Sequence, residues 1–246
     1  MRADYLLIDI SNSFTKLAFS STRRVRRATR VPTRDLDRAA LKSILREAEV
    51  GGIIVSSVVP AKNAVVRRAA GGAPILFINA KTKLGVGVDY PRPSTIGADR
   101  LANAAAVAHL YGTPAIVVDF GTAVTFDVVS ADGTYIGGVI APGLESMTSF
   151  LYQRTALLPK LTLREPASAI GKTTRSAMMS GAVYGYRGLV REIIARVAAE
   201  AFPKRQVRVV ATGGYAELIA HRLPEIEAVH PGLTLEGLRL IGNLNL

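Results

Sequence analysis

The feature that most constrains the fold of this chain is an internal repeat. Residues 5–19 and 115–129 follow one pattern: an apolar run, an aspartate, a turn of small residues and a second apolar run. The aspartates are Asp9 and Asp119, which lie 110 positions apart. We expect this offset to stay constant, so that every residue of the first segment aligns with the residue 110 positions later. Because a buried strand has no packing reason to end in a carboxylate, its recurrence argues against a chance match. The repeat predicts two related halves, each opening with a strand meander.

The segments after the first repeat alternate between strand and helix patterns. Apolar runs at 52–59 and 74–78 are typical of buried strands, and a helix-length segment at 61–70 separates them. An amphipathic helix is expected after Pro32, with Thr33 as its N-cap. This alternation predicts an α/β fold with parallel strands in its sheets.

The second half is expected to repeat this plan after a break at residues 112–114, which include a glycine and a proline. A hairpin turn is expected at 131–134, so that three strands precede the helices of this half. We therefore expect two domains, residues 1–113 and residues 114–246.

Composition limits the metal chemistry of the chain. Its 246 residues include no cysteine and three histidines, so disulfides, thiolate zinc sites and redox dithiols are excluded. Any metal must be held by oxygen atoms or by these few imidazoles. Hard cations such as magnesium or potassium are therefore the expected ions.

Two stretches bear on membranes and location. The longest uncharged stretch, 101–118, approaches the length of a membrane-spanning helix, but it contains Asn103, His109 and a Gly-Thr-Pro breaker. It is better explained as a helix followed by a strand. Asp4 and Asp9 interrupt what would be the apolar region of a signal peptide, so we expect a cytoplasmic protein without a membrane anchor.

Positive charge is concentrated in one segment. The chain has a formal net charge of +12, and its densest cluster comprises Arg23, Arg24, Arg26, Arg27 and Arg30. These arginines alternate with small apolar residues as in a half-exposed strand, and a polyanion-binding patch is the alternative. Because no aromatic side chain lies between them to stack on bases, we expect no nucleic-acid partner.

Two common nucleotide motifs fail. Residues 171–173 (Gly-Lys-Thr) resemble the end of a P-loop, but Pro166 occupies the position of its first glycine. Residues 85–87 (Gly-Val-Gly) begin a dinucleotide motif, but its third glycine position holds Tyr90. A different phosphate scheme remains, in which N–H groups of a small-residue turn approach phosphate and a strand-end carboxylate holds a cation.

Three loops fit that scheme. Asp9 and Asp119 each end a strand before such a turn, and residues 211–214 form a glycine-rich junction suited to a nucleoside. We expect the two aspartates to face each other across a cleft and to hold a polyphosphate. Asp99, in the first turn of a predicted helix, has two explanations: a favourable interaction with the helix dipole, or a general base beside the Arg100 guanidinium.

Six short motifs follow one another along the chain. They are Asp9–Ser13, Gly97–Arg100, Asp119–Ala123, Gly137–Gly143, Thr155–Pro159 and Gly171–Thr174. In order and spacing this set resembles the type III pantothenate kinases. That family belongs to the superfamily of acetate and sugar kinases, Hsp70 and actin. The resemblance therefore implies two duplicated ribonuclease H-like domains, the actin-like ATPase fold, with a cleft between them.

The resemblance also implies roles for individual residues. ATP would bind at Asp9, Ile10, Ser11, Asn12, Ser13, Phe14, Thr15, Lys16 and Thr122, with Asp9 near magnesium. Pantothenate would bind at Tyr90, Gly97, Ala98, Asp99, Arg100 and Thr174, with Asp99 as the catalytic base. Asp119 would hold a monovalent cation, potassium or ammonium.

These roles imply ATP-dependent phosphorylation of pantothenate to 4′-phosphopantothenate, the first step of coenzyme A biosynthesis, by a homodimer. Two alternatives stay open: a kinase for another small hydroxylated substrate, and a non-catalytic regulatory protein of the same family. One position departs from the family, because Ser11 replaces a glycine. We expect Ser11→Gly to tighten ATP binding, since glycine tolerates positive φ and permits a closer approach of phosphate. The alternative is weaker binding, because a serine in an ordinary backbone conformation can donate its hydroxyl to a phosphate oxygen.

Overall fold

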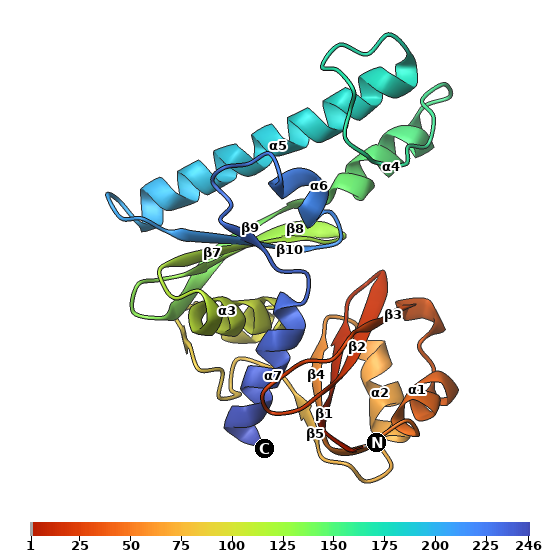
Figure 1. The fold of residues 1–246 in the computed structure, drawn as a ribbon, viewed down its shortest axis with the longest axis vertical. Coiled ribbons are helices and arrows are strands. Elements are labelled where there is room, and N and C mark those ends of the chain that lie inside the picture. The colour runs from red at the N-terminus through yellow and green to blue at the C-terminus, as the bar shows by residue number, and fades with distance from the viewer. Residues whose placement is uncertain (1) are drawn as a thin grey trace. The chain divides into compact units, whose positions relative to one another are not determined.

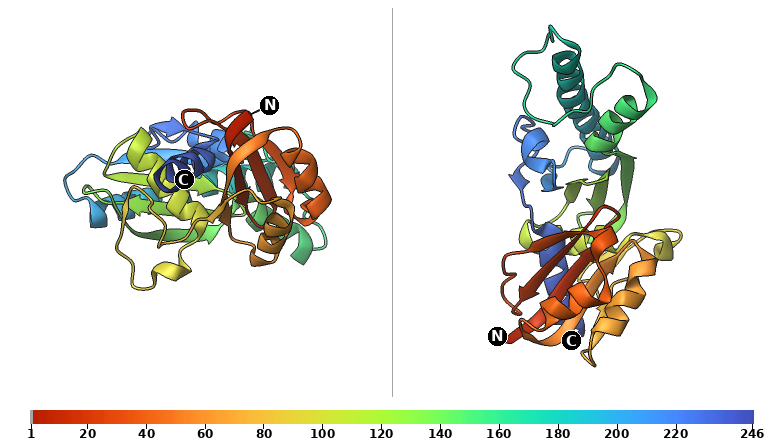
Figure 2. Two further views of the ribbon diagram at one scale, coloured as in Figure 1. Left: turned by 90° about the horizontal axis from the view of Figure 1, so that it is seen from below. Right: turned by 90° about the vertical axis from the view of Figure 1, so that its right-hand side faces the viewer.

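The computed structural model describes residues 2–246, which divide into two compact units (Figure 1, Figure 2). Unit 1 comprises residues 2–112, 133–136 and 232–246. Unit 2 comprises residues 113–132 and 137–231. Each unit is built on its own mixed sheet, and we describe the two separately.

The sheet of unit 1 has five strands in the order β3-β2-β1-β4-β5. They are β1 (Arg2–Ile10), β2 (Phe14–Ser20), β3 (Thr29–Pro32), β4 (Glu49–Ser57) and β5 (Ile75–Phe77). The first three strands form an antiparallel meander, whereas β4 pairs parallel to β1 and β5 parallel to β4. Because helices cover both faces of the sheet, β1 and β4 are apolar over most of their length. This arrangement confirms the expected α/β sheet.

Two helices, α1 (Arg38–Leu45) and α2 (Pro60–Ala69), cover the first face of this sheet. The expected N-cap at Thr33 is wrong. Thr33 begins a short 3-10 helix, η1 (Thr33–Asp35), and Asp37 caps α1 by accepting a hydrogen bond from Ala40 N at 2.7 Å. Aspartate is a stronger N-cap than threonine. The Thr33 hydroxyl donates instead to Ser11 O at 2.6 Å, which ties η1 to the turn after β1.

Helices α3 (Ala98–Leu110) and α7 (Leu233–Asn245) pack against each other and against the second face of the same sheet. Their close crossing depends on Gly237, where a Cβ would overlap the Ala102 carbonyl. The observed units therefore differ from the expected ranges 1–113 and 114–246. Residues 232–246 group with unit 1 because α7 buries its apolar side chains on α3, β1 and β4.

The sheet of unit 2 repeats the plan of unit 1. Its strands are β7 (Ala115–Phe120), β8 (Ala123–Val129), β9 (Thr134–Pro142), β10 (Arg208–Gly213) and β11 (Ala228–Val229), in the order β11-β10-β7-β8-β9-β6. The short β6 (Gly87–Val88) pairs with Thr134 and Tyr135, the first two residues of β9. These four residues group with unit 1. Without β6, the strand order matches β3-β2-β1-β4-β5. The directions match as well where β7 pairs with β8, β10 with β7 and β11 with β10. The duplication is thus confirmed as a shared topology.

The two hairpins at the repeated aspartates differ by one residue. Asp9 pairs with Lys16 across the first hairpin, whereas Asp119 pairs with Thr125 across the second. The expected constant offset of 110 is therefore wrong for the second strand, where it falls to 109. Turn length sets hairpin register, and the second turn is one residue shorter. Lys16 thus corresponds to Thr125, and unit 2 has no lysine at this position.

Three helices complete unit 2: α4 (Leu144–Arg154), α5 (Thr174–Ala201) and α6 (Ala216–Ala220). α5 packs on one face of the sheet, where Tyr186 and Val190 meet Phe120 and Phe126. The end of α4 and the start of α5 project beyond the sheet, joined by residues 155–173 (Figure 2). Within residues 2–246, no helix is both long and apolar enough to cross a bilayer.

The arginine-rich segment is not the strand expected from its alternation. β3 begins only at Thr29, and residues 21–28 form a loop with one bridge, between Ser20 and Val25. The side chains of Ser20 and Ser21 bind the backbone of this loop, which satisfies groups that a strand ladder would otherwise pair. Its arginines are exposed: Arg23, Arg24, Arg26 and Arg27.

Candidate active site

Asp9 lies in a row of polar side chains that crosses four strands of unit 1. The register places Arg30, Lys16, Asp9 and Ser56 side by side on β3, β2, β1 and β4. Asp9 points to the face opposite α1 and α2, because its neighbours along β1 belong to the core on that side. Its side chain is 4% exposed, whereas Lys16 is half-buried and Arg30 is exposed. The row can attract an anion at its basic end and a cation at Asp9.

The turn after β1 is held by hydrogen bonds from its own hairpin and from η1. Ser11 N donates to Phe14 O at 3.2 Å, and the hydroxyls of Thr33 and Thr15 lie 3.0 Å apart. Among residues 2–246, the single non-glycine residue with positive φ is Lys204, so Ser11 lies outside the left-handed region. The conformational part of the Ser11→Gly expectation is therefore wrong, because this turn does not require glycine.

Asp99 begins α3 beside the ends of β1 and β4. Val58 N donates to Ile10 O at 3.0 Å, and Gly97, the N-cap of α3, lies against Val58. The half-buried carboxylate of Asp99 occupies the space that a side chain at residue 97 would fill. Its Oδ1 also accepts a hydrogen bond from Arg100 N at 2.9 Å. Glycine at position 97 thus lets the carboxylate lie flat against the start of the helix.

Arg100 and Tyr90 meet on the ring of Tyr135. The Arg100 Cζ lies 5.7 Å from the centre of that ring, and the Tyr90 ring centre lies 6.2 Å from it. The Tyr135 carbonyl accepts a hydrogen bond from Asp89 N at 2.9 Å, next to Tyr90 in the chain. Tyr135 is 0% exposed. The structure therefore joins two predicted substrate-binding side chains through a buried tyrosine.

Ala98, the remaining predicted substrate-binding residue of this segment, is the first residue of α3, and its side chain is buried. It can contact a ligand only through its backbone. The segment 97–100 therefore presents the helix start, one carboxylate and one guanidinium from unit 1. A helix N-terminus favours negative charge, so the Asp99 carboxylate is also stabilised there.

Asp119, the last residue but one of β7, is half-buried on the face of its sheet opposite α5. Its register partners are Thr212 on β10 and Thr125 on β8. Gly213 follows Thr212 with φ +95°, and a Cβ there would lie 2.6 Å from Asp119 Oδ1. This position needs glycine twice, for the left-handed backbone and for the space of the carboxylate.

Thr122 lies exposed in the turn between β7 and β8. Its carbonyl accepts hydrogen bonds from Gly143 N at 3.1 Å and from Ser146 Oγ at 2.8 Å. A Cβ on Gly143 would overlap that carbonyl, so glycine permits this contact. Tyr186 donates to Pro142 O at 3.2 Å, and burial raises the pKa of Tyr186 further above neutral pH. The turn is therefore fixed by α4 and α5.

Thr174 lies apart from the other predicted residues of unit 2. It is the exposed first residue of α5, and Thr173 caps this helix through reciprocal hydrogen bonds with Ser176. Its neighbour Arg175 donates to Lys160 O at 3.1 Å, whereas the Thr122 turn contacts the beginning of α4.

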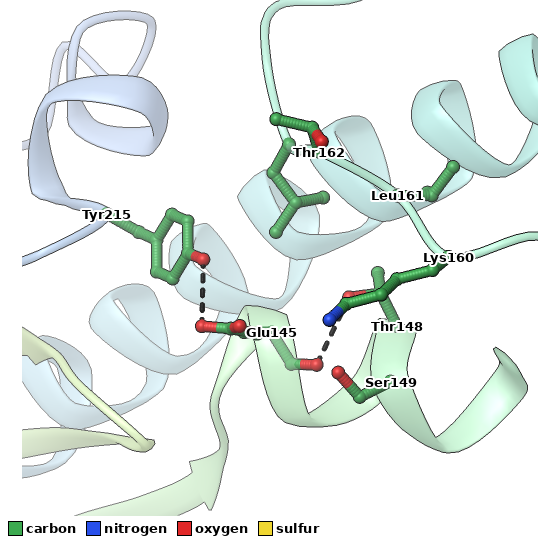
Figure 3. Close-up of a pocket in the computed structure, with 8 residues that line it drawn as sticks. Glu145, Thr148, Ser149, Lys160, Leu161, Thr162 and Tyr215 are labelled. Carbon is green, nitrogen blue, oxygen red and sulfur yellow. Dashed lines mark hydrogen bonds between the residues drawn. The ribbon is translucent and has the colours of Figure 1, made fainter. Parts of the chain in front are cut away.

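A cavity of about 300 Å³ lies in unit 2 between α4, residues 160–163 and Tyr215 (Figure 3). The Tyr215 hydroxyl donates to Glu145 Oε2 at 3.0 Å, and Tyr215 N donates to Phe120 O at 3.4 Å. None of the predicted site residues lines the cavity. Tyr215 nevertheless directly follows the glycine-rich loop 211–214, which places the cavity next to the loop expected to contact a nucleoside.

The donors near both aspartates fit hard cations. Within residues 2–246, no group of three or more His, Cys, Asp or Glu side chains could share one metal ion. A cation at Asp9 or Asp119 would therefore have at most two ligands of these types and would complete its shell with hydroxyl, carbonyl, water or phosphate oxygens. Magnesium accepts such a shell, because it is usually bound by one or two carboxylates plus substrate phosphates.

Sequence reasoning missed three side chains that the structure places at these sites. Ser56 and Thr212 are the parallel partners of the two aspartates, and Tyr135 joins Arg100 to Tyr90. A signal for the first two was present, because each is a hydroxyl that ends an otherwise apolar strand. Tyr135 carried no local signal, since its partners are distant in the chain.

Comparisons with known proteins identify the family of this chain. A family model described as type III pantothenate kinase matches residues 5–196. A type III pantothenate kinase of Akkermansia muciniphila is 49% identical over 98% of this chain and 99% of its own length. One from Geobacter sulfurreducens is 41% identical over 98% of each chain.

Two solved structures share the fold at low sequence identity. A Campylobacter jejuni protein, described as a conserved Baf family transcriptional activator, has a TM-score of 0.64 at 20% identity and covers 98% of this chain and 100% of its own. An inorganic polyphosphate/ATP-glucomannokinase of Arthrobacter has a TM-score of 0.54 at 16% identity and covers 99% of each chain. The family match spans most of the sequence and includes the motifs at Asp9, Asp99 and Asp119, and this chain therefore belongs to the type III pantothenate kinase family.

Proposed function

We propose that this chain transfers the γ-phosphoryl group of ATP to the primary hydroxyl of pantothenate and forms 4′-phosphopantothenate, the first step of coenzyme A biosynthesis. Family membership supports the reaction, since the relatives are named for it. The observation that carries the assignment to a site is the Asp99 carboxylate, which lies over Gly97 at a helix start, beside Arg100.

Asp99 accepts the hydroxyl proton of pantothenate. In phosphoryl transfer through a loose transition state, catalysis is mainly positioning and charge stabilisation, so a carboxylate of ordinary basicity can serve as the base. Arg100, held over the Tyr135 ring, binds the carboxylate of pantothenate, and Tyr90, on the same ring, contacts pantothenate beside it. The backbone of Gly97 and Ala98 and the side chain of Thr174 are expected to bind pantothenate as well.

One assay tests this function against its alternatives. Pantothenate-dependent ADP release is expected only from a pantothenate kinase, because another sugar kinase or a regulatory protein would not respond to pantothenate. Asp99→Asn should lower kcat by about 10²- to 10⁴-fold while ATP binding, measured by calorimetry, stays near wild type. Asp37→Asn is the matched control, because asparagine also caps α1. Equal turnover in both variants would return Asp99 to the helix-dipole explanation.

The phosphates of ATP bind at the turn and strand from Asp9 to Lys16, and also contact Thr122. Magnesium supplies charge neutralisation for the transferred phosphoryl group, and Asp9 would hold it. The cross-strand pair of Asp9 and Lys16 supports this role, because it places a carboxylate and an ammonium group side by side. The nucleoside is expected along the glycine-rich loop 211–214.

Asp119 holds a monovalent cation, potassium or ammonium, with oxygen ligands around it. This role predicts activity that rises with potassium or ammonium chloride and stays low in sodium chloride alone. Equal rates in the three salts at constant ionic strength would contradict it. Asp119→Asn should remove the salt dependence.

The protein acts as a homodimer in the cytoplasm. The projecting part of unit 2 supports the dimer, since it exposes apolar side chains, with Leu157 88% and Ile170 80% exposed. Sedimentation should give twice the chain mass, and Leu157→Asp or Ile170→Asp should yield monomers. A monomeric wild type would contradict this assembly. Cell fractionation tests the location.

A further inference from the structure

Each unit buries one aliphatic hydroxyl that has no hydrogen-bond partner among residues 2–246, beside its strand-end aspartate. In unit 1 it is Ser56 Oγ, on the residue that pairs with Asp9. In unit 2 it is Thr212 Oγ1, on the residue that pairs with Asp119. Both residues are 0% exposed. The two hydroxyls thus occupy equivalent positions in the duplicated fold.

Each hydroxyl lies on the same face of its sheet as the neighbouring aspartate. Val55 and Ala211, one residue before each hydroxyl, belong to the cores under α1–α2 and under α5. Side chains alternate along a strand, so Ser56 and Thr212 point to the opposite faces, as Asp9 and Asp119 do. Each carboxylate therefore has an adjacent hydroxyl oxygen.

The other buried serine and threonine hydroxyls in the described chain do have partners. Thr15 pairs with Thr33, Thr234 donates to Asn103, and Ser20 donates to two backbone carbonyls. Buried polar side chains normally have at least one partner, and alanine or valine would fill the same strand positions without leaving an unpaired oxygen. Two equivalent exceptions beside the two aspartates point to a shared ligand chemistry.

We infer that Ser56 and Thr212 are oxygen ligands of the cations that Asp9 and Asp119 hold. A phosphate oxygen next to a carboxylate is repelled, whereas a hard cation is attracted to the carboxylate and accepts a hydroxyl oxygen as a further ligand. Ser56 serves the magnesium of Mg-ATP, and Thr212 serves the monovalent ion. The identity of these two ions rests on the proposed function, but the pairing of hydroxyl and carboxylate does not.

Thr212→Val tests the monovalent site by stability as well as by activity. Valine keeps the shape of threonine and removes an unpaired hydroxyl, so the ion-free protein should unfold at the same temperature as wild type or higher. Potassium should raise the unfolding temperature of both proteins, measured against choline chloride at constant ionic strength. The potassium concentration at half of this rise should be about tenfold higher or more for Thr212→Val than for wild type.

Thr125→Val is the matched control for this experiment. Thr125 is the other register partner of Asp119, but its hydroxyl lies 3.4 Å from Asp127 Oδ2. The control should unfold at a lower temperature without ions and keep the wild-type response to potassium. If Thr212→Val behaves like this control, the inference is overturned, because the Thr212 hydroxyl would then be structural.

Ser56→Ala tests the magnesium site in the same way. Its dissociation constant for Mg-ATP, measured by calorimetry, should rise about tenfold, while its unfolding temperature without ligand does not fall. Ser20→Ala is the control, because the Ser20 hydroxyl is buried on the same sheet but already bonded. Wild-type affinity for Mg-ATP in Ser56→Ala would overturn this half of the inference.

The wild-type protein separates failure of this inference from failure of the proposed function. Pantothenate-dependent ADP release reports on the function alone. If that release is present but Thr212→Val and Ser56→Ala respond to potassium and to Mg-ATP as the wild type does, the inference fails and the function stands. If ADP release is absent while potassium and Mg-ATP still stabilise the wild type and not the corresponding variants, the cation sites stand without the kinase reaction.

Discussion

Gly97→Ala should separate folding from chemistry at the Asp99 site. Residue 97 has φ −58° and ψ 138°, a conformation that alanine adopts without strain. The change should therefore stabilise the protein by about 0.4–1 kcal/mol, because alanine restricts the unfolded chain more than glycine does. Any loss of activity would then come from the site and not from unfolding.

The geometry gives the size of that loss. A Cβ at position 97 would lie 3.5 Å from Val58 Cγ1, an ordinary contact, but far closer than 3.0 Å to Asp99 Oδ1. The carboxylate must retreat by about 1 Å to reach a van der Waals distance. Misplacing a reacting group by about 1 Å costs roughly 10²-fold in rate. We expect kcat to fall about 100-fold, or about 2.7 kcal/mol in activation free energy.

The assay is steady-state ADP release at saturating ATP and pantothenate, together with the unfolding temperature of the same preparation. Gly188→Ala is the control, because a Cβ on this helical glycine meets nothing within 4 Å. It should raise stability by about 0.5–1 kcal/mol without a change in kcat. A Gly97→Ala enzyme with wild-type kcat would refute the reasoning, since the position of the carboxylate would then not matter.

Three further changes test other parts of the structure. Tyr135→Leu should raise KM for pantothenate far more than KM for ATP, because the ring holds Arg100. Tyr135→Phe keeps the ring and should have a KM for pantothenate near that of wild type. Equal effects of Tyr135→Leu on both KM values would contradict this role. Ser11→Gly should leave ATP affinity unchanged in calorimetry and lower stability by about 0.4–1 kcal/mol, because residue 11 has no positive φ for glycine to relieve. Glu165 has its pKa lowered chiefly by its hydrogen bond with Arg187, so its contribution is present above the unfolded pKa, about 4.3, and is lost as pH falls through the folded value. The difference in unfolding temperature between wild type and Glu165→Gln should therefore shrink as the pH falls from about 7 to below about 4, and a constant difference would contradict the pairing.

The repeat could be predicted from the sequence because buried strands that end in aspartate are uncommon, but its register could not be read from a constant offset. The offset of 110 aligns Lys16 with Phe126, and thus aligns a half-buried cation with a core side chain. An offset of 109 aligns Leu17 with Phe126, and both belong to their cores. The alternation of apolar residues therefore indicates the correct register of the second strand. The shorter second turn explains why the offset changes from 110 to 109.

The site was predictable only where its signal was local. Asp99 could be singled out because a carboxylate beside a guanidinium starts a helix. Tyr135 could not, because its contacts with Tyr90 and Arg100 depend on the pairing of β6 with β9, which joins segments distant in sequence. The unpaired state of the Ser56 and Thr212 hydroxyls likewise follows from three-dimensional packing, which no spacing in the sequence reveals.

The differences between the two halves explain why equivalent aspartates can hold different ions. Asp9 has Lys16 opposite it on the antiparallel strand, and an ammonium group there favours phosphate and a phosphate-bound magnesium. Asp119 has Thr125 at the equivalent position, so its register partners are hydroxyls and add no positive charge. A carboxylate with neutral oxygen neighbours suits a weakly charged cation, since nothing beside it competes electrostatically with the ion. If the proposed roles hold, the shorter second hairpin, which sets Thr125 and not a lysine opposite Asp119, accounts for the different ions at the two aspartates.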